Sequence, residues 1–330
     1  MSDVAEREIL EQIDATIDRL GRVRAEIGRV IFGQDRVVDE TLTTLLAGGH
    51  VLLVGVPGLA KTRLVETLGT VLGLSQKRVQ FTPDLMPADI LGSEILEETE
   101  GGRRGFRFVP GPVFCQLLMA DEINRASPRT QAALLQAMQE RRVTVAGHDH
   151  PLPAPFHVLA TQNPIEQEGT YPLPEAQLDR FLLQVNIDYP EIAAERQMLI
   201  ATTGRSEATV GPVLDARRLG EAQALVRRMP VGDQVVDAIL RLVRAGRPET
   251  SELHELRDQV AWGPGPRASQ ALMLTVRVRA LLHGRLSPSL EDVIALAPPV
   301  LRHRMALTFT ARAEGVTLDR VIERLCRLVA

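Results

Sequence analysis

Five apolar runs recur along the middle of the chain and alternate with segments of helical periodicity. The central runs are unbroken, which is typical of parallel strands that are covered on both faces. They predict five strands, at residues 50–54, 78–81, 113–120, 156–160 and 181–187. Strand–helix alternation of this kind predicts an α/β domain built around a parallel five-stranded sheet.

Helical periodicity dominates both ends of the chain. The N-terminal segment places apolar residues at helical spacing, namely Ile9, Ile13, Ile17, Leu20, Ile27 and Val30. Residues 1–30 are therefore expected to form a helical segment that either packs on its own domain or makes an oligomer contact. After Tyr189-Pro190 the periodicity is helical again. We expect the α/β domain to span residues 31–190 and a smaller, all-helical lid domain to span residues 191–330.

Two segments interrupt the strand–helix alternation. Residues 87–112 contain Gly101-Gly102 and Gly105, which suggests a hairpin inserted between a helix and a strand. Residues 142–155 combine a β-prone stretch, a turn at Gly147 and a proline-rich return. Both segments are therefore expected to form hairpins.

The composition is that of an ordinary globular protein and weighs mildly against a nucleic-acid reader. The formal net charge is -4 and aromatic residues make up 3%, so the chain has no global basic field and few rings on which bases could stack. No apolar stretch approaches the roughly 18–20 residues of a membrane span. The acidic N-terminus also lacks the segments of a signal peptide. We therefore expect a cytoplasmic protein without membrane insertion.

A glycine-rich segment follows the first predicted strand and opens a helix, which is the setting of a phosphate-binding loop. In such a loop, backbone N–H groups face the phosphates, Lys61 reaches the outer phosphates, and Thr62 offers a hydroxyl to Mg²⁺. Ala60 stands where the general pattern has glycine, and its methyl group is tolerated if its φ stays negative. The alternative is a plain glycine–proline turn. The residues predicted to contact the nucleotide are Gly55, Val56, Pro57, Gly58, Leu59, Ala60, Lys61, Thr62 and Arg63.

Polar residues end the third and fourth predicted strands. Two adjacent carboxylates, Asp121 and Glu122, would be costly to bury without a cation or hydrogen bonds. Beside a phosphate loop, Asp121 would hold Mg²⁺ and Glu122 would orient and deprotonate the attacking water. Asn163 could hold the same water and the γ-phosphate. An acidic pair also caps helices, and Asn163 could instead serve the turn before Pro164, but together with the loop these residues predict an ATPase.

Arg267 lies in the first turn of a predicted helix that starts near Pro266. A cation gains nothing from the helix dipole at that place, so a phosphate partner explains it better than a simple surface arginine does. If Arg267 from the helical domain and Lys61 from the α/β domain grip the same phosphates, ATP would change the angle between the two domains.

In this order, the elements make the chain resemble the MoxR group of the AAA+ superfamily, in its helix-2-insert branch, over nearly the whole length. Ala60, unusual in phosphate loops generally, is the usual residue in this group. The lid reads Gly-Pro-Arg at residues 265–267, where the group usually has Ser-Pro-Arg. The segments that carry the resemblance are GVPGLAKT (55–62), QFTPDL (80–85), GPVF (111–114), ADEINRA (120–126), ATQNP (160–164) and YPLPEAQLDRF (171–181).

The resemblance implies roles for the residues at the predicted strand ends. Lys61 and Thr62 would belong to the Walker A motif, and Asp121 and Glu122 to the Walker B motif. Asn163 would be sensor 1. ATP and Mg²⁺ are the implied cofactors.

The resemblance also implies residues that act on a second subunit or on a client. Arg180 would be the arginine finger that reaches a neighbour's γ-phosphate, and Arg267 would be sensor 2. Gly33-Gln34, just ahead of the first strand, would line the adenine pocket. The hairpins at about 87–112 and 142–155 would be the helix-2 insert and the pre-sensor-1 hairpin. Relatives of this kind work as rings, with a hexamer as the expected form, and often pair with partners that carry a von Willebrand factor A domain.

Three functions compete on this basis. A chaperone-like ATPase that remodels or activates partner proteins fits best. A metal-chelatase motor subunit shares the insert, but its phosphate loop would be expected to carry glycine in place of Ala60. A nucleic-acid-directed motor would want a basic hairpin. The charges of the first hairpin are mixed, with Arg103, Arg104 and Arg107 set against Glu94, Glu97, Glu98 and Glu100.

Overall fold

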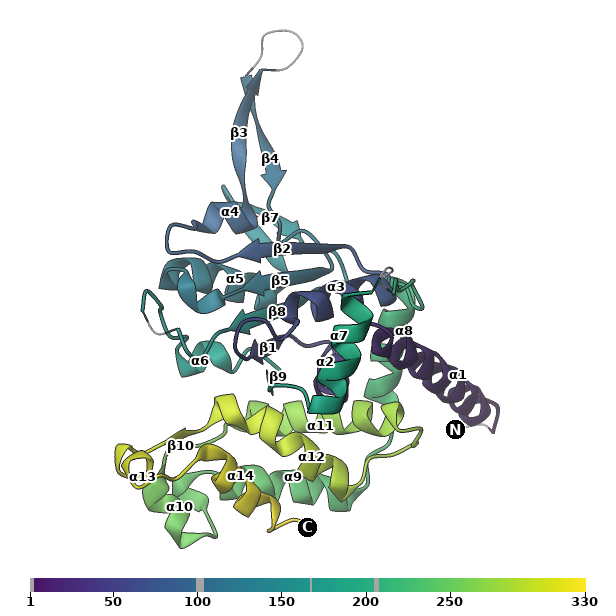
Figure 1. The fold of residues 1–330 in the computed structure, drawn as a ribbon, viewed down its shortest axis with the longest axis vertical. Coiled ribbons are helices and arrows are strands. Elements are labelled where there is room, and N and C mark those ends of the chain that lie inside the picture. Colours follow the sequence, from purple (N-terminus) through teal and green to yellow (C-terminus); the bar gives the residue numbers. More distant parts are fainter. Residues whose placement is uncertain (1–2, 99–103, 167, 205–207) are drawn as a thin grey trace.

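A parallel five-stranded sheet forms the centre of the molecule (Figure 1). The computed structural model describes residues 3–98, 104–166, 168–204 and 208–330, and the side chains from residue 10 onward within those ranges. The strand order is β2-β5-β8-β1-β9, and every neighbouring pair is parallel. The predicted α/β sheet is thereby confirmed. The strands are β1 (Val51–Val54), β2 (Gln76–Gln80), β5 (Leu117–Asp121), β8 (His157–Gln162) and β9 (Leu183–Asn186).

Three strands begin two or more residues from the predicted starts, namely β2, β5 and β9, the last at Leu183 rather than at residue 181. The run from residue 113 stays outside the sheet until Leu117, because the Phe114 and Cys115 N–H groups donate to carbonyl oxygens within the same short turn. Strand β2 begins at Gln76 rather than at residue 78, because its polar start pairs with Leu117 of β5. Hydrogen-bonding partners, which composition does not reveal, therefore set these ends.

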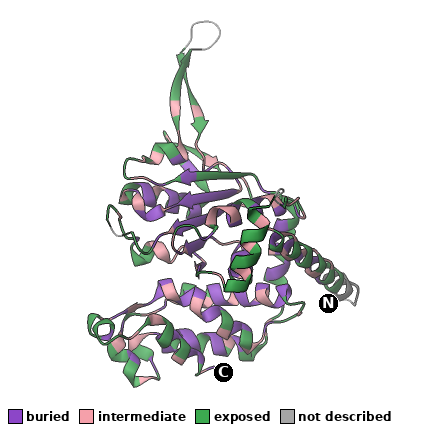
Figure 2. Cartoon of the chain, in the orientation of Figure 1, coloured by how far each residue is buried: buried purple, intermediate pink, exposed green. Residues whose placement is uncertain are grey.

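Both faces of the sheet are buried, which explains the unbroken apolar runs. Along β1, Val51 and Leu53 point into one apolar cluster while Leu52 points into the other. Leu118 of β5 and Val158 of β8 join Leu52 on its face. Figure 2 shows the central strands as largely buried, whereas the edge strand β2 is mostly exposed.

Helices cover the two faces. Helix α1 packs on this chain's own core, since Leu20, Val23 and Ile27 are buried there. On the other face, α5 buries Leu134 and Leu135. The helices of this region are α1 (Asp3–Gly28), α2 (Asp35–Leu46), α3 (Lys61–Val71), α4 (Pro87–Leu91), η1 (Ile123–Arg125), α5 (Pro128–Glu140) and α6 (Glu175–Leu178).

Two antiparallel hairpins leave the α/β region. The long hairpin pairs β3 (Gly92–Glu98) with β4 (Arg104–Pro110) and extends away from the sheet in Figure 1, whereas the short one pairs β6 (Arg142–Val145) with β7 (His148–Pro151). The hairpins contact each other, because the rings of Phe108 and His150 stack with centroids 3.8 Å apart. Glu100, Gly101, Gly102 and Arg103 lie outside the described residues.

The C-terminal part of the chain is largely helical, as expected for a lid. It also holds one short antiparallel pair that the helical pattern did not indicate, between β10 (Val260–Trp262) and β11 (Ala306–Leu307), where Val260 and Leu307 are buried partners. None of the helices in the described ranges is long and apolar enough to span a membrane. The helices are α7 (Ile192–Thr202), α8 (Ala216–Arg228), α9 (Asp233–Ala245), η2 (Pro248–Thr250), α10 (His254–Gln259), α11 (Pro266–Leu282), α12 (Leu290–Leu301), η3 (Arg302–Arg304), α13 (Phe309–Ala313) and α14 (Leu318–Cys326).

Candidate active site

Three neighbouring strands bring the predicted site residues to one edge of the sheet. Strand β8 lies between β5 and β1, and all three run in the same direction. The segments that follow them therefore meet at the carboxyl edge, which is where ligands bind in open α/β sheets. These segments are the phosphate loop at residues 55–62, the pair Asp121-Glu122, and Asn163.

The phosphate loop needs left-handed backbone at two places. Gly58 has φ +85°, and Ala60, the N-cap residue of α3, has φ +57° and ψ +23°. The condition under which an alanine would be tolerated here, a negative φ at Ala60, is therefore not met. The loop must turn sharply to present the start of α3, and that turn places residue 60 in the left-handed region, where an alanine is strained by about 1–2 kcal/mol. Glycine, the residue of the general pattern, would avoid this strain.

Lys61 lies over the loop that precedes it. Its Nζ atom donates to the carbonyl oxygens of Gly55 at 2.5 Å and Val56 at 3.3 Å. Partial burial lowers the pKa of Lys61, and the nearby carboxylates of Asp121 and Glu122 act in the opposite direction. Thr62 and Arg63 follow in the first turn of α3, both partly exposed. The ammonium group is thus held beside the acidic pair, at the start of a helix.

Thr161 joins the Asp121 carboxylate to the backbone of Glu122. Its Oγ1 donates to Asp121 Oδ1 at 2.5 Å and accepts the Glu122 N–H at 2.8 Å. Asp121 also forms an ion pair with Arg78, whose Nη2 donates to Asp121 Oδ2 at 2.5 Å. These bonds explain how the buried Asp121 carboxylate is tolerated at the end of an apolar strand.

Glu122 is more open than Asp121, with a quarter of its side chain exposed. Its backbone is left-handed, with φ +55°, which turns the chain sharply after β5. Gln80 Nε2 donates to its Oε2 at 2.7 Å, and Arg125 Nη1 does so at 3.2 Å. The carboxylate is therefore oriented by side chains from β2 and η1 while one side of it faces solvent.

The residues at this edge suit a hard divalent cation. Mg²⁺ prefers oxygen ligands and keeps several waters. Asp121 and Thr62 would supply such oxygens. Asp121 accepts two bonds at Oδ2 and one at Oδ1, so at least one lone pair of Oδ1 stays open. A bound Mg²⁺ would neutralise charge on the outer phosphates of ATP.

Asn163 follows β8 between the loop and the acidic pair and is 4% exposed. Its Oδ1 accepts the Ile165 N–H at 3.1 Å, which fixes the side-chain amide within the turn. The turn interpretation and the site interpretation of Asn163 are therefore compatible, because the amide oxygen serves the turn and the amide nitrogen has no hydrogen bond with any described residue.

A cavity of about 480 Å³ lies beside the phosphate loop and is large enough for a nucleobase. It is lined by residues of the loop, by Gln34 and by α7. Gly33 allows α7 to approach, because a Cβ atom on Gly33 would lie 2.2 Å from the Cβ atom of Ala194. Gln34 Nε2 donates to the Leu59 carbonyl oxygen at 3.2 Å and so ties this segment to the loop. Gly33-Gln34 were expected just ahead of the first strand. Helix α2 instead separates these two residues from β1.

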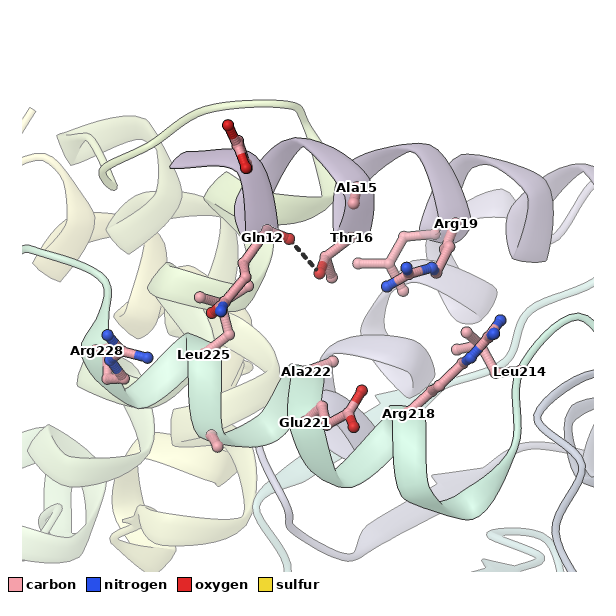
Figure 3. Close-up of a pocket in the computed structure, with 13 residues that line it drawn as sticks. Gln12, Ala15, Thr16, Arg19, Leu214, Arg218, Glu221, Ala222, Leu225 and Arg228 are labelled. Atoms are coloured by element: carbon pink, nitrogen blue, oxygen red, sulfur yellow. Dashed lines mark hydrogen bonds between the residues drawn. The ribbon is translucent and has the colours of Figure 1, made fainter. Parts of the chain in front are cut away.

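A second cavity, of about 640 Å³, lies between α1 and α8 (Figure 3). Its lining includes Gln12, Thr16, Arg19 and Glu221. The Thr16 hydroxyl donates a hydrogen bond to the backbone carbonyl oxygen of Gln12 at 2.7 Å. None of the residues predicted to act on a nucleotide lines it. It is therefore separate from the candidate site.

Arg180 lies toward the opposite edge of the sheet. Val51 of β1 pairs with Leu183 of β9, and the Leu182 N–H donates to the His50 carbonyl oxygen at 2.7 Å. Arg180 thus precedes the start of this strand pair, whereas the phosphate loop follows its end. The four residues of β1 alone span about 13 Å. The partly exposed side chain of Arg180 has no hydrogen bond or ion pair with any residue that the structure describes.

Arg267 contacts Asp179, next to Arg180, rather than lying beside Lys61. Its Nη1 atom lies 3.4 Å from Oδ2 of Asp179, the residue before Arg180. The expectation that Arg267 and Lys61 grip the same phosphates within one chain therefore does not hold in this structure. The reason is where the lid packs, because α12 and η3 contact β9 and α6 and so place the start of α11 beside residue 179.

Sequence reasoning missed three side chains that orient the acidic pair, namely Arg78, Gln80 and Arg125. Arg78 and Gln80 alternate with the buried Val79 along β2 and so share one face of the strand. This alternation is visible in the sequence, but it does not show that β2 lies next to β5. Strand neighbours in a parallel sheet come from crossover connections, which local patterns do not specify.

Comparison with known proteins settles the family. The model of the ATPase family associated with various cellular activities (AAA) matches residues 50–183, and that of the AAA lid domain matches residues 255–325. Chaperone MoxR1 of Mycobacterium tuberculosis is 44% identical over 97% of this chain and 84% of its own length. Protein MoxR of Methylorubrum extorquens is 33% identical over 88% of both chains. The chain belongs to the MoxR family of AAA ATPases.

The fold comparison agrees. A crystal structure from Cytophaga hutchinsonii is similar to this MoxR-family chain with a TM-score of 0.90 and 35% sequence identity, covering 98% of each chain. As a member of this family the chain binds and hydrolyses ATP, and the carboxyl edge described above is where the residues suited to that reaction gather.

The backbone at Ala60 yields a prediction about stability. Ala60→Gly should raise the free energy of unfolding by up to about 1.6 kcal/mol, because relief of about 1–2 kcal/mol of left-handed strain outweighs about 0.4–1 kcal/mol of added unfolded-chain entropy. Ala60→Val should lower it. Urea denaturation measures both. Ala132→Gly, at an exposed position within α5, is the matched control and should lose about 1 kcal/mol; equal losses for the two glycine variants would refute the strain.

The roles of Lys61 and Glu122 separate in kinetics. Lys61→Ala should weaken ATP binding, because a charge beside the phosphates is lost. Glu122→Gln should bind ATP within a few-fold of the wild type yet turn over about 10²–10⁴ times more slowly, because only the base is removed. Binding of a fluorescent ATP analogue and phosphate release distinguish the two. Glu140→Gln, on the exposed end of α5, is the control, and wild-type turnover in Glu122→Gln would exclude Glu122 as the base.

Proposed function

We propose that this MoxR-family ATPase works as a ring of identical subunits, with a hexamer as the expected form, and that it uses ATP and Mg²⁺ to remodel or activate partner proteins. The observation that carries the ring is the separation of charges across the sheet. Lys61, Asp121 and Glu122 gather at the carboxyl edge, while Arg180 and Arg267 gather at the amino edge.

The separation argues against action of these arginines within one chain. An arginine finger stabilises the charge of the transferring phosphoryl group only if it contacts the γ-phosphate. Across a strand of about 13 Å, Arg180 cannot do so in its own subunit. In a head-to-tail ring, the amino edge of one subunit faces the phosphate loop of the next, and such heterologous contacts close into rings when the rotation allows. We propose that Arg180 and Arg267 both act on the neighbour's nucleotide.

A protein client is supported by the long hairpin. Leu96 and Phe106 are directly opposite each other on β3 and β4, and they are 57% and 73% exposed. Large apolar side chains that remain exposed together mark interaction sites. Figure 2 shows this hairpin as largely exposed along its length. We therefore propose that the hairpin contacts apolar segments of clients.

The charges of the same hairpin do not favour nucleic acid. Arg107 pairs with Glu97 at 2.7 Å, which leaves Glu94 and Glu98 to balance Arg104 among the described residues. A groove that tracks a phosphate backbone would need an excess of unpaired cations. The client we propose is accordingly a protein, either a partner with a von Willebrand factor A domain or another chain matured with its help.

Ring assembly predicts that hydrolysis depends on neighbours. Arg180→Ala should bind ATP normally and turn over about 10³–10⁵ times more slowly, because the arginine that would reach the phosphate is lost. Specific activity of the wild type should also rise with protein concentration. Phosphate release across a dilution series measures this, with Arg129→Ala, on the exposed start of α5, as the control. Constant activity per subunit down to monomer would contradict the proposal.

The hairpin yields a second prediction. Leu96→Ser combined with Phe106→Ser should leave basal ATP turnover unchanged, because the hairpin lies away from the carboxyl edge, but should abolish protection of heat-denatured citrate synthase from aggregation. Light scattering measures the protection. Glu98→Ser, an exposed position on the same hairpin, should keep it. Several-fold stimulation of turnover by DNA at low salt, with no effect of the apolar substitutions, would instead favour a nucleic-acid motor.

A further inference from the structure

Arg304 of η3 is a charged residue buried in the lid, with 3% of its side chain exposed. Burial lowers the pKa of Arg304, and its bond to Asp179 acts in the opposite direction. A buried cation is tolerated only when it is paired and fully hydrogen-bonded. The guanidinium has five N–H donors, and each of them has an acceptor here, so the surroundings of Arg304 form a complete binding site for that group.

Four of the five bonds go to the segment of residues 179–182. Nε donates to Asp179 Oδ1 at 2.7 Å, Nη2 to the Phe181 and Asp179 carbonyl oxygens at 2.7 and 3.5 Å, and Nη1 to the Leu182 carbonyl oxygen at 3.0 Å. The fifth bond goes to the Val300 carbonyl oxygen within the lid. Arg304 therefore ties the lid to the α/β domain through one short segment.

His303 adds a second tie at the same place. Its Nε2 lies 2.9 Å from the Phe181 carbonyl oxygen, and burial holds the pKa of His303 well below its usual value. The neutral ring must carry its proton on Nε2, because a carbonyl oxygen can only accept. The residues on both sides of Arg180 are thus held by the lid, while the Arg180 side chain itself stays unpaired among the described residues.

We propose that Arg304, supported by His303, is a positioning residue for Arg180. It holds the segment 179–182 so that Arg180 points out of the subunit in one direction, and it makes that direction depend on the position of the lid. Asp179 strengthens the dependence, because it binds Arg304 at 2.7 Å and Arg267 at 3.4 Å. The lid of one subunit thereby adjusts hydrolysis in the next. This inference rests on the proposed action of Arg180 on a neighbour.

Arg304→Lys tests the proposal because it keeps the charge and removes the planar fork. One ammonium group cannot reach the acceptors of residues 179, 181 and 182 together. A misplacement of about 1 Å in a group that contacts the reacting atoms costs about 10²-fold in rate. Arg302→Lys is the matched control, since Arg302 lies on the same short helix but pairs with Asp319 within the lid.

The experiment mixes two kinds of subunit in one ring. Acceptor subunits carry Arg180→Ala, so they keep an intact phosphate site but offer no Arg180 to a neighbour. Donor subunits in excess carry Glu122→Gln, so they do not hydrolyse ATP but do offer Arg180. Donors are compared in three forms: with Glu122→Gln alone, with Arg304→Lys added, and with Arg302→Lys added. Native mass spectrometry checks that all three enter mixed rings equally. Phosphate release then measures the turnover of the acceptor subunits.

Donors with Glu122→Gln alone, or together with Arg302→Lys, should restore acceptor turnover, while donors that also carry Arg304→Lys should restore about 10²-fold less. In the reverse arrangement, Arg304→Lys subunits keep their own Glu122 and receive Arg180 from Glu122→Gln donors. These subunits should turn over ATP at the wild-type kcat and KM. A merely structural role would lower turnover in both arrangements, and that result would overturn the proposal.

Two further outcomes are decisive. Equal rescue by donors with and without Arg304→Lys would refute the role of Arg304 and leave the proposed ring intact. Absence of rescue by Glu122→Gln donors alone would overturn the ring and this inference with it. If Arg304→Lys subunits fail to fold, donors with Asp179→Asn replace them. These donors keep the bonds from Arg304 to the backbone of residues 181 and 182 but lose the charge of Asp179. Their rescue should therefore also fall, and full rescue would refute the proposal.

Discussion

The arrangement of this protein depends on one constraint, the parallel alignment of β5, β8 and β1 in a sheet that is buried on both faces. Parallel strands end at a common edge, so a phosphate loop, two carboxylates and an amide that are far apart in sequence meet there. The buried faces hold the three strands in register, because a slip of one residue would turn each apolar side chain to the other face.

The same constraint separates the two halves of the chemistry. Every crossover between parallel strands must carry the chain back from the carboxyl edge to the amino edge. The crossover into β9 leaves Arg180 at the amino edge, and the lid places Arg267 beside it. A subunit of this fold holds the phosphate-binding half of a site at one edge and two arginines at the other, and head-to-tail assembly is the simple geometry that joins them.

Two buried polar side chains each join separate elements of the fold. Thr161 joins Asp121 to the backbone of Glu122, and Arg304 joins the lid to the segment around Arg180. Each of these side chains satisfies its partners almost completely, and a group of this kind is costly to move because any displacement leaves a buried polar atom unpaired. The exposed hairpin formed by β3 and β4 is the opposite case, since its apolar side chains contact solvent and remain open to a partner.

The sequence by itself determined the fold class, the sheet, and the phosphate loop and acidic pair at the carboxyl edge, because apolar runs, glycine spacing and acidic strand ends are local patterns. The family resemblance extended this to the ATPase activity and to Arg180 and Arg267. The tertiary structure alone decided the left-handed backbone at Ala60, the position of Arg267 beside Asp179, and the burial of Arg304. These depend on which elements pack together, and contacts between residues 125 positions apart in the chain leave no periodicity for a local pattern to show.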